Sequence, residues 1–385
     1  MRSLREKLMA VASKPSVPAN PPKPRPAESF FCRDYHVPIR ELQGIECTTL
    51  DEIRACDPGF TGQEWDIQKL LFLDTETTGL SGGAGTVAFE IGVGFIEQDH
   101  MTIRQYVMRD YSEECAMLQE IAALLSSYPT LITFNGKTFD LPLLESRMIL
   151  HRIRMHPTQH THLDLLHVCR RVYKLRLKRC SLSALEEAVL GMTRLDDLPG
   201  AQVPQRYFDY IKTREFALLE DVLCHNRQDV QSLAALTGHI CSVFRHPEKL
   251  SHAEDLFSVG RTYERSGKSQ HARRCYKILG HSSMSSQAHM RLAAGYKKER
   301  NWEAALSYYQ TMIAKAEGGS WPYIECAKYY EHVARDYHRA LSYASAALSR
   351  ELNAALLSTQ DDTSIDIIRK RIKRLKAKLM KIPKQ

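Results

Sequence analysis

The stretch that decides the fold is residues 70–80, LLFLDTETTGL. Four apolar residues lead into Asp74, a pattern typical of a buried central strand whose last residue reaches a site at the end of a sheet. Side chains two apart in an extended chain point the same way, so Asp74 and Glu76 lie side by side. Such carboxylates repel each other unless a cation neutralises them. Because oxygen ligands suit Mg²⁺ or Mn²⁺ better than zinc, the stretch predicts a divalent metal site, the alternative being a solvated strand end with helix-capping Asp and Thr residues.

The length and composition of the chain predict a multidomain protein. At about 150 residues per domain, 385 residues correspond to two or three domains, and a hydrophobic content of 43% supports real cores. No apolar run approaches a membrane span, and the charged N-terminus lacks the apolar core of a secretory signal. The ten cysteines form no CxxC pair, which argues against a zinc ribbon or a redox motif. We therefore expect free thiols, a cytoplasmic location and no membrane contact.

Positive charge is concentrated in the C-terminal part of the chain. The net charge is +8 overall, but residues 246–385 hold 25 Lys and Arg against 14 Asp and Glu, a net charge of +11, and the rest of the chain is at −3. A basic region of this kind fits a polyanionic partner. A solvated, lysine-rich tail explains the same numbers, so both interpretations stay open.

The segments around the quoted stretch predict an α/β layer architecture. We expect an N-terminal extension over residues 1–65, with a proline-rich linker at 15–26, followed by a domain over 66–245. Its strands should cover 70–74, 86–97, 101–108 and 131–134, the first three as an antiparallel meander. Its helices should cover 112–127 and 139–151, and a capping box of Ser183 and Glu186 should open another that stops at Gly191.

Two further acids follow apolar segments in this domain. Asp140 comes shortly after the tight-turn dipeptide Asn135-Gly136 and opens a helix. It is therefore either a third acidic ligand or an N-cap. Asp164 follows an apolar alternation and is either a fourth carboxylate of the site or, as we favour, a helix cap.

Residues 147–180 form a basic band with nine Lys or Arg and a single acid. These cations, with Tyr173 among them, are suited to the phosphates and bases of a nucleic acid, and a solvated helix face is the alternative. The five histidines of the region lack the spacing of metal ligands. The candidate nucleic-acid contacts in the band are Arg170, Arg171, Lys174, Arg176, Lys178 and Arg179.

A long amphipathic helix is predicted from Leu219 to Ile240, where apolar residues recur at helical spacing. His225 and Asp229 are four residues apart, so they lie one turn apart on the same face. A histidine beside an acid is either a general base next to a metal ligand or an ordinary pair on a helix surface.

Together these segments resemble the histidine-type DEDD (DnaQ-like) exonucleases, which have a ribonuclease H-like fold, over about residues 66–245. The resemblance rests on three motifs in the family's order: Asp74-Thr-Glu76-Thr-Thr-Gly79-Leu80, Asn135-Gly-Lys-Thr-Phe139-Asp140 and His225-x-x-x-Asp229. It implies a mixed sheet flanked by helices and a metal-dependent 3′–5′ exonuclease that acts with two Mg²⁺ or Mn²⁺ ions.

The same resemblance implies roles for individual residues. The ligands of the ions would be Asp74, Glu76, Asp140 and Asp229, with Asp74 bridging both ions and Asp140 assisting. His225 would be the general base that takes a proton from the attacking water. Thr77 and Asn135, which stand within the motifs, would contact the nucleic acid.

His225 departs from the family pattern in one respect. Histidine-type members usually have five positions from this histidine to the aspartate, whereas this chain has four, as in the tyrosine-type members. The departure concerns the general base and not the metal ligands.

The substrate class rests on a further resemblance. The whole chain, tail region included, resembles a bacterial exonuclease of DNA repair, which implies DNA as the substrate. The alternatives are an RNA exonuclease and a catalytically inactive nuclease-fold scaffold that carries peptide-binding repeats.

Residues 250–385 predict an all-α domain of tetratricopeptide repeats. Small and aromatic residues such as Gly260 and Tyr263 stand at the spacings of these repeats, and Ala293 and Tyr296 follow them 33 residues on. Units of this kind bury their faces by stacking on one another. A basic helix over 363–380 should cap the stack, and a protein partner such as a repair helicase would bind the repeats.

Overall fold

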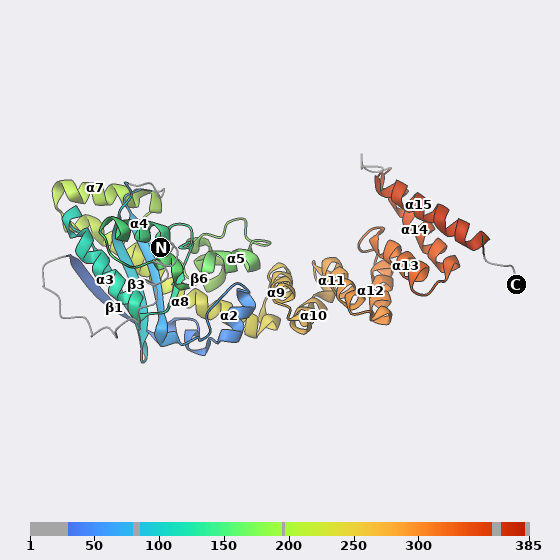
Figure 1. Ribbon diagram of the computed structural model, residues 1–385, viewed down its shortest axis with the longest axis horizontal. Coiled ribbons are helices and arrows are strands. Elements are labelled where there is room, and N and C mark those ends of the chain that lie inside the picture. The colour runs from blue at the N-terminus through green and yellow to red at the C-terminus, as the bar shows by residue number, and fades with distance from the viewer. Residues whose placement is uncertain (1–29, 80–84, 195–196, 356–362, 382–385) are drawn as a thin grey trace, which may run out of the picture.

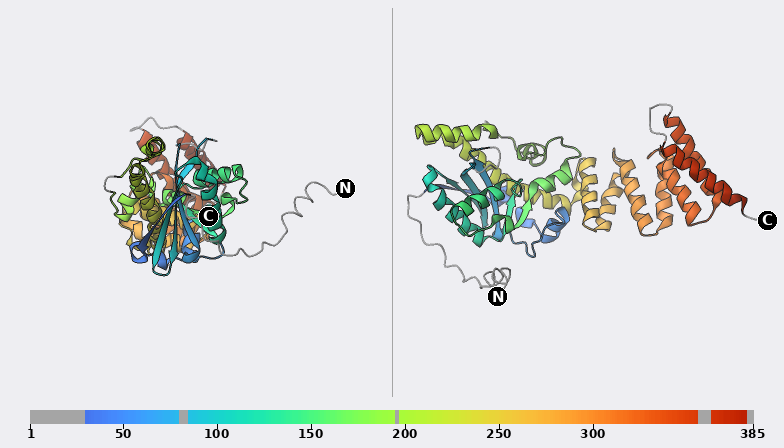
Figure 2. Two further views of the ribbon diagram at one scale, coloured as in Figure 1. Left: turned by 90° about the vertical axis from the view of Figure 1, so that its left-hand side faces the viewer. Right: turned by 45° about the horizontal axis from the view of Figure 1, so that its top comes forward.

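The computed structural model describes residues 30–79, 85–194, 197–355 and 363–381. They form an elongated molecule, with a mixed sheet and its flanking helices at one end and a row of helices at the other (Figure 1). Figure 2 shows the same arrangement from two further sides. The predicted proline-rich linker and the charged N-terminus lie outside the described residues. Within the described ranges, no helix is both long enough and apolar enough to cross a membrane.

The described residues contain a six-stranded mixed sheet in the order β1-β4-β3-β2-β5-β6. Its strands are β1 (Phe31–Pro38), β2 (Leu70–Thr77), β3 (Ala88–Glu97), β4 (His100–Val107), β5 (Thr130–Thr133) and β6 (Thr161–Asp164). The pairs β1–β4, β4–β3 and β3–β2 are antiparallel, whereas β2–β5 and β5–β6 are parallel. The predicted meander of β2, β3 and β4 is confirmed.

Two strands lie outside the predicted set. Strand β1 belongs to the N-terminal extension and pairs with β4 from Phe31 opposite Val107 to Pro38 opposite His100. Its sequence, FCRDYHVP, mixes charged and aromatic residues and lacks the apolar alternation that signals a strand. Strand β6 coincides with the apolar alternation that precedes Asp164, a segment that the predicted set of strands does not include. The sheet therefore begins upstream of residue 66.

Helices cover both faces of the sheet. They include α2 (Leu50–Cys56), α3 (Glu114–Ser127), α4 (Asp140–Leu150), α5 (Leu165–Tyr173), α7 (Val203–Thr213) and α8 (Glu220–Arg245). Residues Leu70 and Phe72 of β2 pack in a core with α2, α5 and α8. Residues Leu71 and Leu73 pack in a second core with α3, α4 and α7. Because strand side chains alternate, Asp74 continues the face that α8 covers.

The segment after α5 corrects one prediction. Ser181, not Ser183, caps the helix α6 (Leu182–Leu185), since its Oγ accepts a hydrogen bond from the Ala184 N–H at 3.3 Å. Helix α6 runs into the π-helical segment η6 (Glu186–Leu190), which ends at Gly191 in the left-handed conformation, as predicted. Glu186 does not turn back to a cap, because it is buried in an ion pair with Arg194.

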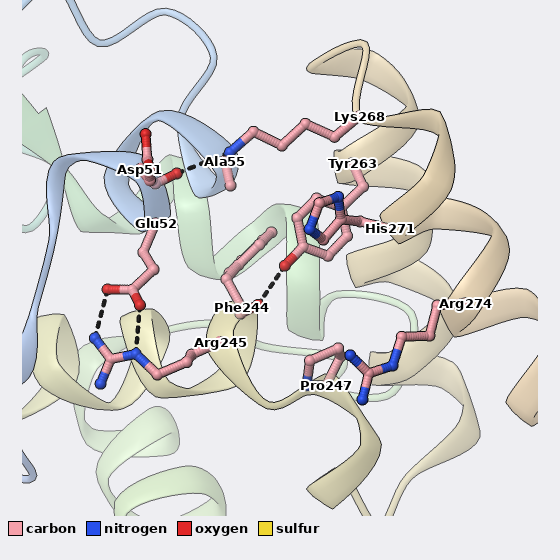
Figure 3. Close-up of a pocket in the computed structure, with 10 residues that line it drawn as sticks. All are labelled: Asp51, Glu52, Ala55, Phe244, Arg245, Pro247, Tyr263, Lys268, His271 and Arg274. Atoms are coloured by element: carbon pink, nitrogen blue, oxygen red, sulfur yellow. Dashed lines mark hydrogen bonds and ion pairs between the residues drawn. The ribbon is translucent and has the colours of Figure 1, made fainter.

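Helix α2 and the end of α8 join the sheet region to helix α9 (Ala253–Arg265). Figure 3 shows the pocket of about 290 Å³ at this joint. Arg245 Nη2 donates to Glu52 Oε2 at 2.7 Å, and Lys268 Nζ donates to the backbone oxygen of Asp51 at 3.0 Å. The first bond joins α8 to α2, and the second ties the row of helices to the sheet region.

Beyond α9 each helix packs on the next. The row continues with α10 (Ser269–Ile278), α11 (Ser285–Lys298), α12 (Trp302–Ala314), α13 (Trp321–His332), α14 (Tyr337–Ala355) and α15 (Thr363–Met380). Small residues meet aromatic ones in this row: a Cβ at Gly260 would come within 2.7 Å of the Tyr276 ring. The predicted helical C-terminal region, including its last helix, is confirmed.

A buried carboxylate ties α15 to α13. Glu331 is 2% exposed and accepts hydrogen bonds from Arg371 Nη1 at 2.5 Å, Arg374 Nε at 2.8 Å and Lys378 Nζ at 2.9 Å. Burial by itself would raise the pKa of Glu331, but the bonds from Arg374 and Lys378 outweigh burial and lower the pKa to about 2. The ionised carboxylate therefore holds the last helix on the row.

Replacing Glu331 with Gln should loosen α15. We expect a loss of about 2 kcal/mol of unfolding free energy, less than the ~3–5 kcal/mol for breaking a fully buried pair, because Arg374 and Lys378 are partly exposed. A carboxylate whose pKa is lower in the folded state than in the unfolded state stabilises the fold in full only above its unfolded-state pKa. The difference from wild type should therefore be full above about pH 4.5 and vanish as the pH falls towards 2.

Urea unfolding over this pH range and hydrogen exchange in α15 measure the effect of Glu331→Gln. The control is Glu303→Gln on the exposed surface of α12. Wild-type stability and α15 protection in Glu331→Gln at pH 7 would contradict the prediction.

Candidate metal and nucleic-acid site

Strand β2 presents Asp74 and Glu76 on the same side of the sheet, as predicted. Asp74 pairs with Gly92 of β3, and Glu76 pairs with Glu90. Both Asp74 and Glu76 are half-buried. Strand β2 continues to Thr77, so a helix-capping strand end does not describe these residues.

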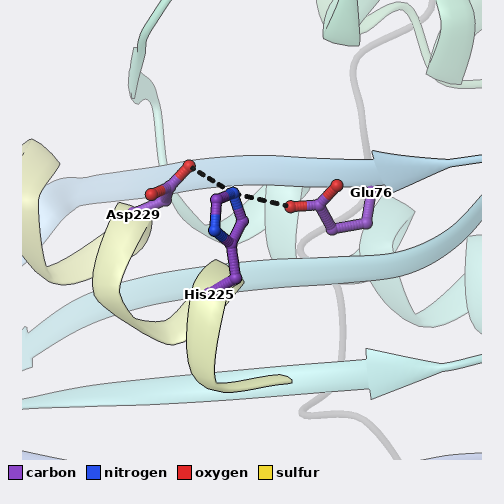
Figure 4. Close-up of side chains that lie close together, drawn as sticks. All are labelled: Glu76, His225 and Asp229. Atoms are coloured by element: carbon purple, nitrogen blue, oxygen red, sulfur yellow. Dashed lines mark ion pairs between the residues drawn. The ribbon is translucent and has the colours of Figure 1, made fainter. Parts of the chain in front are cut away.

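Helix α8 brings His225 and Asp229 towards Glu76 (Figure 4). The Nε2 atom of His225 lies 3.7 Å from Glu76 Oε1 and 3.7 Å from Asp229 Oδ2. One donor atom from each of the three residues lies within 4.8 Å of the others. A group of this size can hold a metal ion, and the predicted one-turn relation of His225 and Asp229 brings two of its members together.

Asp74 stands outside this group of three and is held by a buried amide. Asn226 Nδ2 donates to Asp74 Oδ2 at 3.0 Å, and Gln105 Nε2 donates to Asn226 Oδ1 at 3.1 Å. Asn226 is fully buried. Asn226 is not among the residues predicted from the sequence, although a polar residue at an inward position of an amphipathic helix is a signal of a buried polar contact.

Asp140 approaches from the other side of β2. It is the first residue of α4 and not its N-cap, and it is buried. Its Oδ1 accepts a hydrogen bond from Thr75 Oγ1 at 2.5 Å. Thr75 lies between Asp74 and Glu76 in the sequence. Three successive residues of β2 therefore carry two of the predicted acids and the contact with the third, Asp140.

The acids of the site repel one another. Burial raises the pKa of Asp74 well above its usual range, and the charges of Asp229, Glu76 and Asp140 raise it further. Burial and the charges of Glu90 and Asp229 act in the same way on the pKa of Glu76. Burial also raises the pKa of Asp140 to about 6. A divalent cation would relieve this repulsion, and a donor set rich in carboxylate oxygens fits Mg²⁺ or Mn²⁺.

A cleft of about 650 Å³ opens beside these acids, with Asp74 and Asp229 in its wall. Asn135 also lines it, and the Asn135 N–H donates to Asp164 Oδ1 at 2.8 Å. Asp164 caps α5, as we favour from the sequence, by accepting from the Leu166 N–H at 3.1 Å. The rest of the cleft wall holds four cations among apolar and small residues. Its cations are Arg170, Lys174, Lys178 and Arg179, and all four are exposed.

Three predicted nucleic-acid contacts lie elsewhere. Arg171 Nη1 donates to Asp57 Oδ1 at 3.0 Å, because one residue along α5 turns the side chain about 100° away from Arg170. Arg176 Nε donates to Asp255 of α9 at 2.7 Å. Thr77 is buried and donates to the backbone oxygen of Gly79. These side chains serve the fold and do not line the cleft.

Two charged residues missed by the sequence analysis lie beside α8. Arg194 binds Glu186 with two nitrogens, at 2.5 and 2.6 Å, and also donates to Asp229. Asp197 Oδ1 lies 2.7 Å from His225 Nδ1. Arg194 and Asp229 are 35 residues apart, so no local spacing connects them.

The comparisons with known proteins agree with this architecture. A family model described as the RNase_H superfamily matches residues 71–241, from β2 through most of α8. The chain therefore contains a ribonuclease H superfamily domain, which points to a nuclease that acts on nucleic acid.

The whole chain has a relative of similar length. It is 32% identical over 375 residues to the uncharacterized protein YprB of Bacillus subtilis (strain 168), covering 92% of this chain and 88% of that protein. The chain therefore belongs to the YprB family. A family B DNA polymerase from Pyrobaculum calidifontis shares 13% identity with a TM-score of 0.37, over 54% of this chain and 30% of that chain. Because the similarity to the polymerase is this low, the fold assignment rests on the family model and on the strand order.

Gly92 should be required for the close approach of α8 to β3. A Cβ at this position would overlap Oδ1 of Asn226, the residue that holds Asp74. We expect Gly92→Ala to cost about 1–3 kcal/mol of unfolding free energy, as overpacking of a core does. Urea unfolding measures the loss. The control is Gly200→Ala, where an added Cβ meets no atom within 4 Å, and equal stability of the two variants would contradict the prediction.

Proposed function

We propose that the chain is a metal-dependent 3′–5′ exonuclease that hydrolyses DNA, with a role in DNA repair. The observation that carries the proposal is the convergence of four carboxylates and a histidine beside a cleft lined with cations. The ribonuclease H superfamily domain supports nuclease chemistry. The 3′–5′ direction rests on the resemblance of the three motifs to the DEDD exonucleases, and the choice of DNA rests on the resemblance of the whole chain to a repair exonuclease.

The four carboxylates would hold two metal ions. Glu76 and Asp229 offer oxygens close to one another, and the resemblance of the motifs assigns the further ligand positions to Asp74 and Asp140. When bound, two Mg²⁺ or Mn²⁺ ions would activate water and stabilise the leaving oxygen of a phosphodiester. His225 is suited to accept the proton of the attacking water, because its Nε2 faces the same point as Glu76 and Asp229.

The cations of the cleft would bind the phosphates of the strand. Arg170, Lys174, Lys178 and Arg179 are exposed and line the same cleft as Asp74. Asn135, which belongs to the second motif, lines the same cleft. A strand that follows the cleft would reach Asp74 with its end.

The row of helices would bind a protein. We assign residues 250–385 to tetratricopeptide repeats, because helices α9 to α14 form three successive pairs and Gly260 meets Tyr276 as the repeat spacing requires. We assign the nuclease domain to residues 66–245 together with β1. A stack of repeats offers an extended surface, and a helicase of DNA repair is the partner we propose.

Asp74→Asn and Asp229→Asn should abolish digestion. Each variant removes a negative charge that would hold a metal ion. Because the ion would stabilise the transition state by several kcal/mol, the rate should fall roughly 10³-fold or more. Mn²⁺ at millimolar concentration should raise the melting temperature of the wild type and of neither variant. Asp209→Asn, on the exposed surface of α7, is the control.

Matched DNA and RNA strands labelled at the 5′ end, with Mg²⁺ or Mn²⁺, give the direction and the substrate class. A shortening ladder from DNA is the expected result. Digestion that persists in both variants means that this is not the site, and preferred digestion of RNA identifies an RNA exonuclease. Absence of both digestion and a Mn²⁺ shift in the wild type identifies an inactive scaffold.

Lys174→Gln and Lys178→Gln should weaken DNA binding uniformly across sequences. Each should also reduce the slope of log K against log salt by about 1, because one phosphate contact is lost. Fluorescence anisotropy over a salt series, with the Asp74→Asn protein as background, measures both quantities. Arg154→Gln removes an exposed cation outside the cleft, and an equal effect of this control would rule out a specific path through the cleft.

A further inference from the structure

An ion cluster that is buried at Arg194 and Glu186 and open to solvent at Asp197 contacts the two site residues of α8. Its members are Glu186, Arg194 and Asp197. The side chain of Arg194 is 8% exposed and that of Glu186 is 1% exposed. Bidentate bonds to Glu186 fix the guanidinium of Arg194 in one orientation.

Arg194 and the proposed metal site use opposite oxygens of Asp229. Arg194 Nη2 donates to Asp229 Oδ1. The other oxygen, Oδ2, is the atom that lies 3.7 Å from His225 Nε2. The arginine therefore turns the carboxylate of Asp229 so that its free oxygen faces Glu76 and His225.

Asp197 does the same for His225. Its Oδ1 lies 2.7 Å from His225 Nδ1, and its Oδ2 accepts from Arg194 Nη1 at 3.1 Å. A carboxylate can only accept here, so Nδ1 carries the proton and Nε2 keeps its lone pair. Arg194 Nη1 also lies 3.2 Å from Nδ1. Because Nη1 can only donate, it would pair with Nδ1 only in the tautomer that carries its proton on Nε2.

We propose that Arg194 and Asp197 form a positioning clamp that presents Asp229 Oδ2 and His225 Nε2 to one point beside Glu76. The inference rests on the proposed function for its meaning, but the geometry of the clamp can be tested without metal or activity. A cluster that only anchored its segment to α8 would leave the tautomer of His225 and the affinity for metal unchanged.

The tautomer is the first measurement. Full-length protein with ¹⁵N-labelled histidine, compared with His225→Gln to assign the signal, should show His225 protonated on Nδ1 in the absence of metal. In Asp197→Ala, Arg194 Nη1 becomes the remaining neighbour of Nδ1, and the proton should move to Nε2. Asp197→Asn keeps an accepting oxygen and should keep the wild-type tautomer.

The affinity for Mn²⁺, followed by electron paramagnetic resonance without DNA, is the second measurement. Arg194→Ala should weaken it by roughly 10–100-fold, the usual effect of losing a group that orients a metal ligand. Arg194→Lys should not restore it, because one ammonium cannot replace the fork that spans Glu186 and Asp229, whereas added guanidinium should restore it in Arg194→Ala. Asp197→Ala should leave the Mn²⁺ affinity near that of wild type and lower turnover by about 10²-fold with KM for DNA unchanged.

The exposed pair Arg206–Asp221, which links α7 and α8, supplies matched controls in Arg206→Ala and Asp221→Ala. Both should keep the tautomer and the Mn²⁺ affinity of wild type. Tighter Mn²⁺ binding in Arg194→Ala would mean that the arginine competes with metal, and an unchanged tautomer in Asp197→Ala would leave Asp197 structural; either overturns the clamp. If the wild type digests neither DNA nor RNA, the proposed function fails, while the tautomer and Mn²⁺ measurements still decide the clamp.

Discussion

The rest of the structure depends on the repulsion among carboxylates that the fold buries together. Asp74 and Glu76 on β2, Asp140 on α4 and Asp229 on α8 approach one another in surroundings where charge is poorly solvated. The fold opposes the repulsion with side-chain donors: Asn226 for Asp74, Thr75 for Asp140 and Arg194 for Asp229. These donors do not cancel the negative charge, since the pKa values of Asp74 and Glu76 stay raised. Incomplete compensation of this kind is what a site for a divalent cation would require.

This constraint also determines how closely α8 must approach the sheet. Asn226 reaches Asp74 only because β3 has no side chain at Gly92, and Val230 packs one turn further along where β3 has none at Gly94. Gln105 of β4 then binds both Asn226 and Glu90, with Nε2 2.7 Å from Glu90 Oε1. The buried amides thus connect β2, β3, β4 and α8, which explains why neutral polar residues are fully buried in the centre of this region.

Sequence reasoning succeeds here where the signal is local and fails where it depends on packing. Strand β2, helix α8 and the placement of Asp74, Glu76, His225 and Asp229 follow from periods of two and of 3.6 residues, which need no knowledge of partners. Strand β1 is missed because its pairing with β4 supplies the stability that its own composition does not. Arg194 and Asp197 are missed for a related reason: their partners on α8 are about 30 residues away, and a lone Arg or Asp after a helix has no pattern. The capping box of Ser183 and Glu186 fails because a buried arginine competes for the glutamate.

The basic band shows the same limit and adds a mechanical consequence. Composition treats its cations as equivalent, but α5 divides them by direction. Arg170 and Lys174 project into the cleft, whereas Arg171 reaches Asp57 beside α2, and Arg176 reaches Asp255 on α9. Since the pair Arg176–Asp255 is largely buried, it holds the first helix of the row against the segment that also carries Lys174 and Lys178. Motion of α9 would therefore act on the wall of the cleft through this stretch of chain, in addition to the contacts that α9 makes with α2.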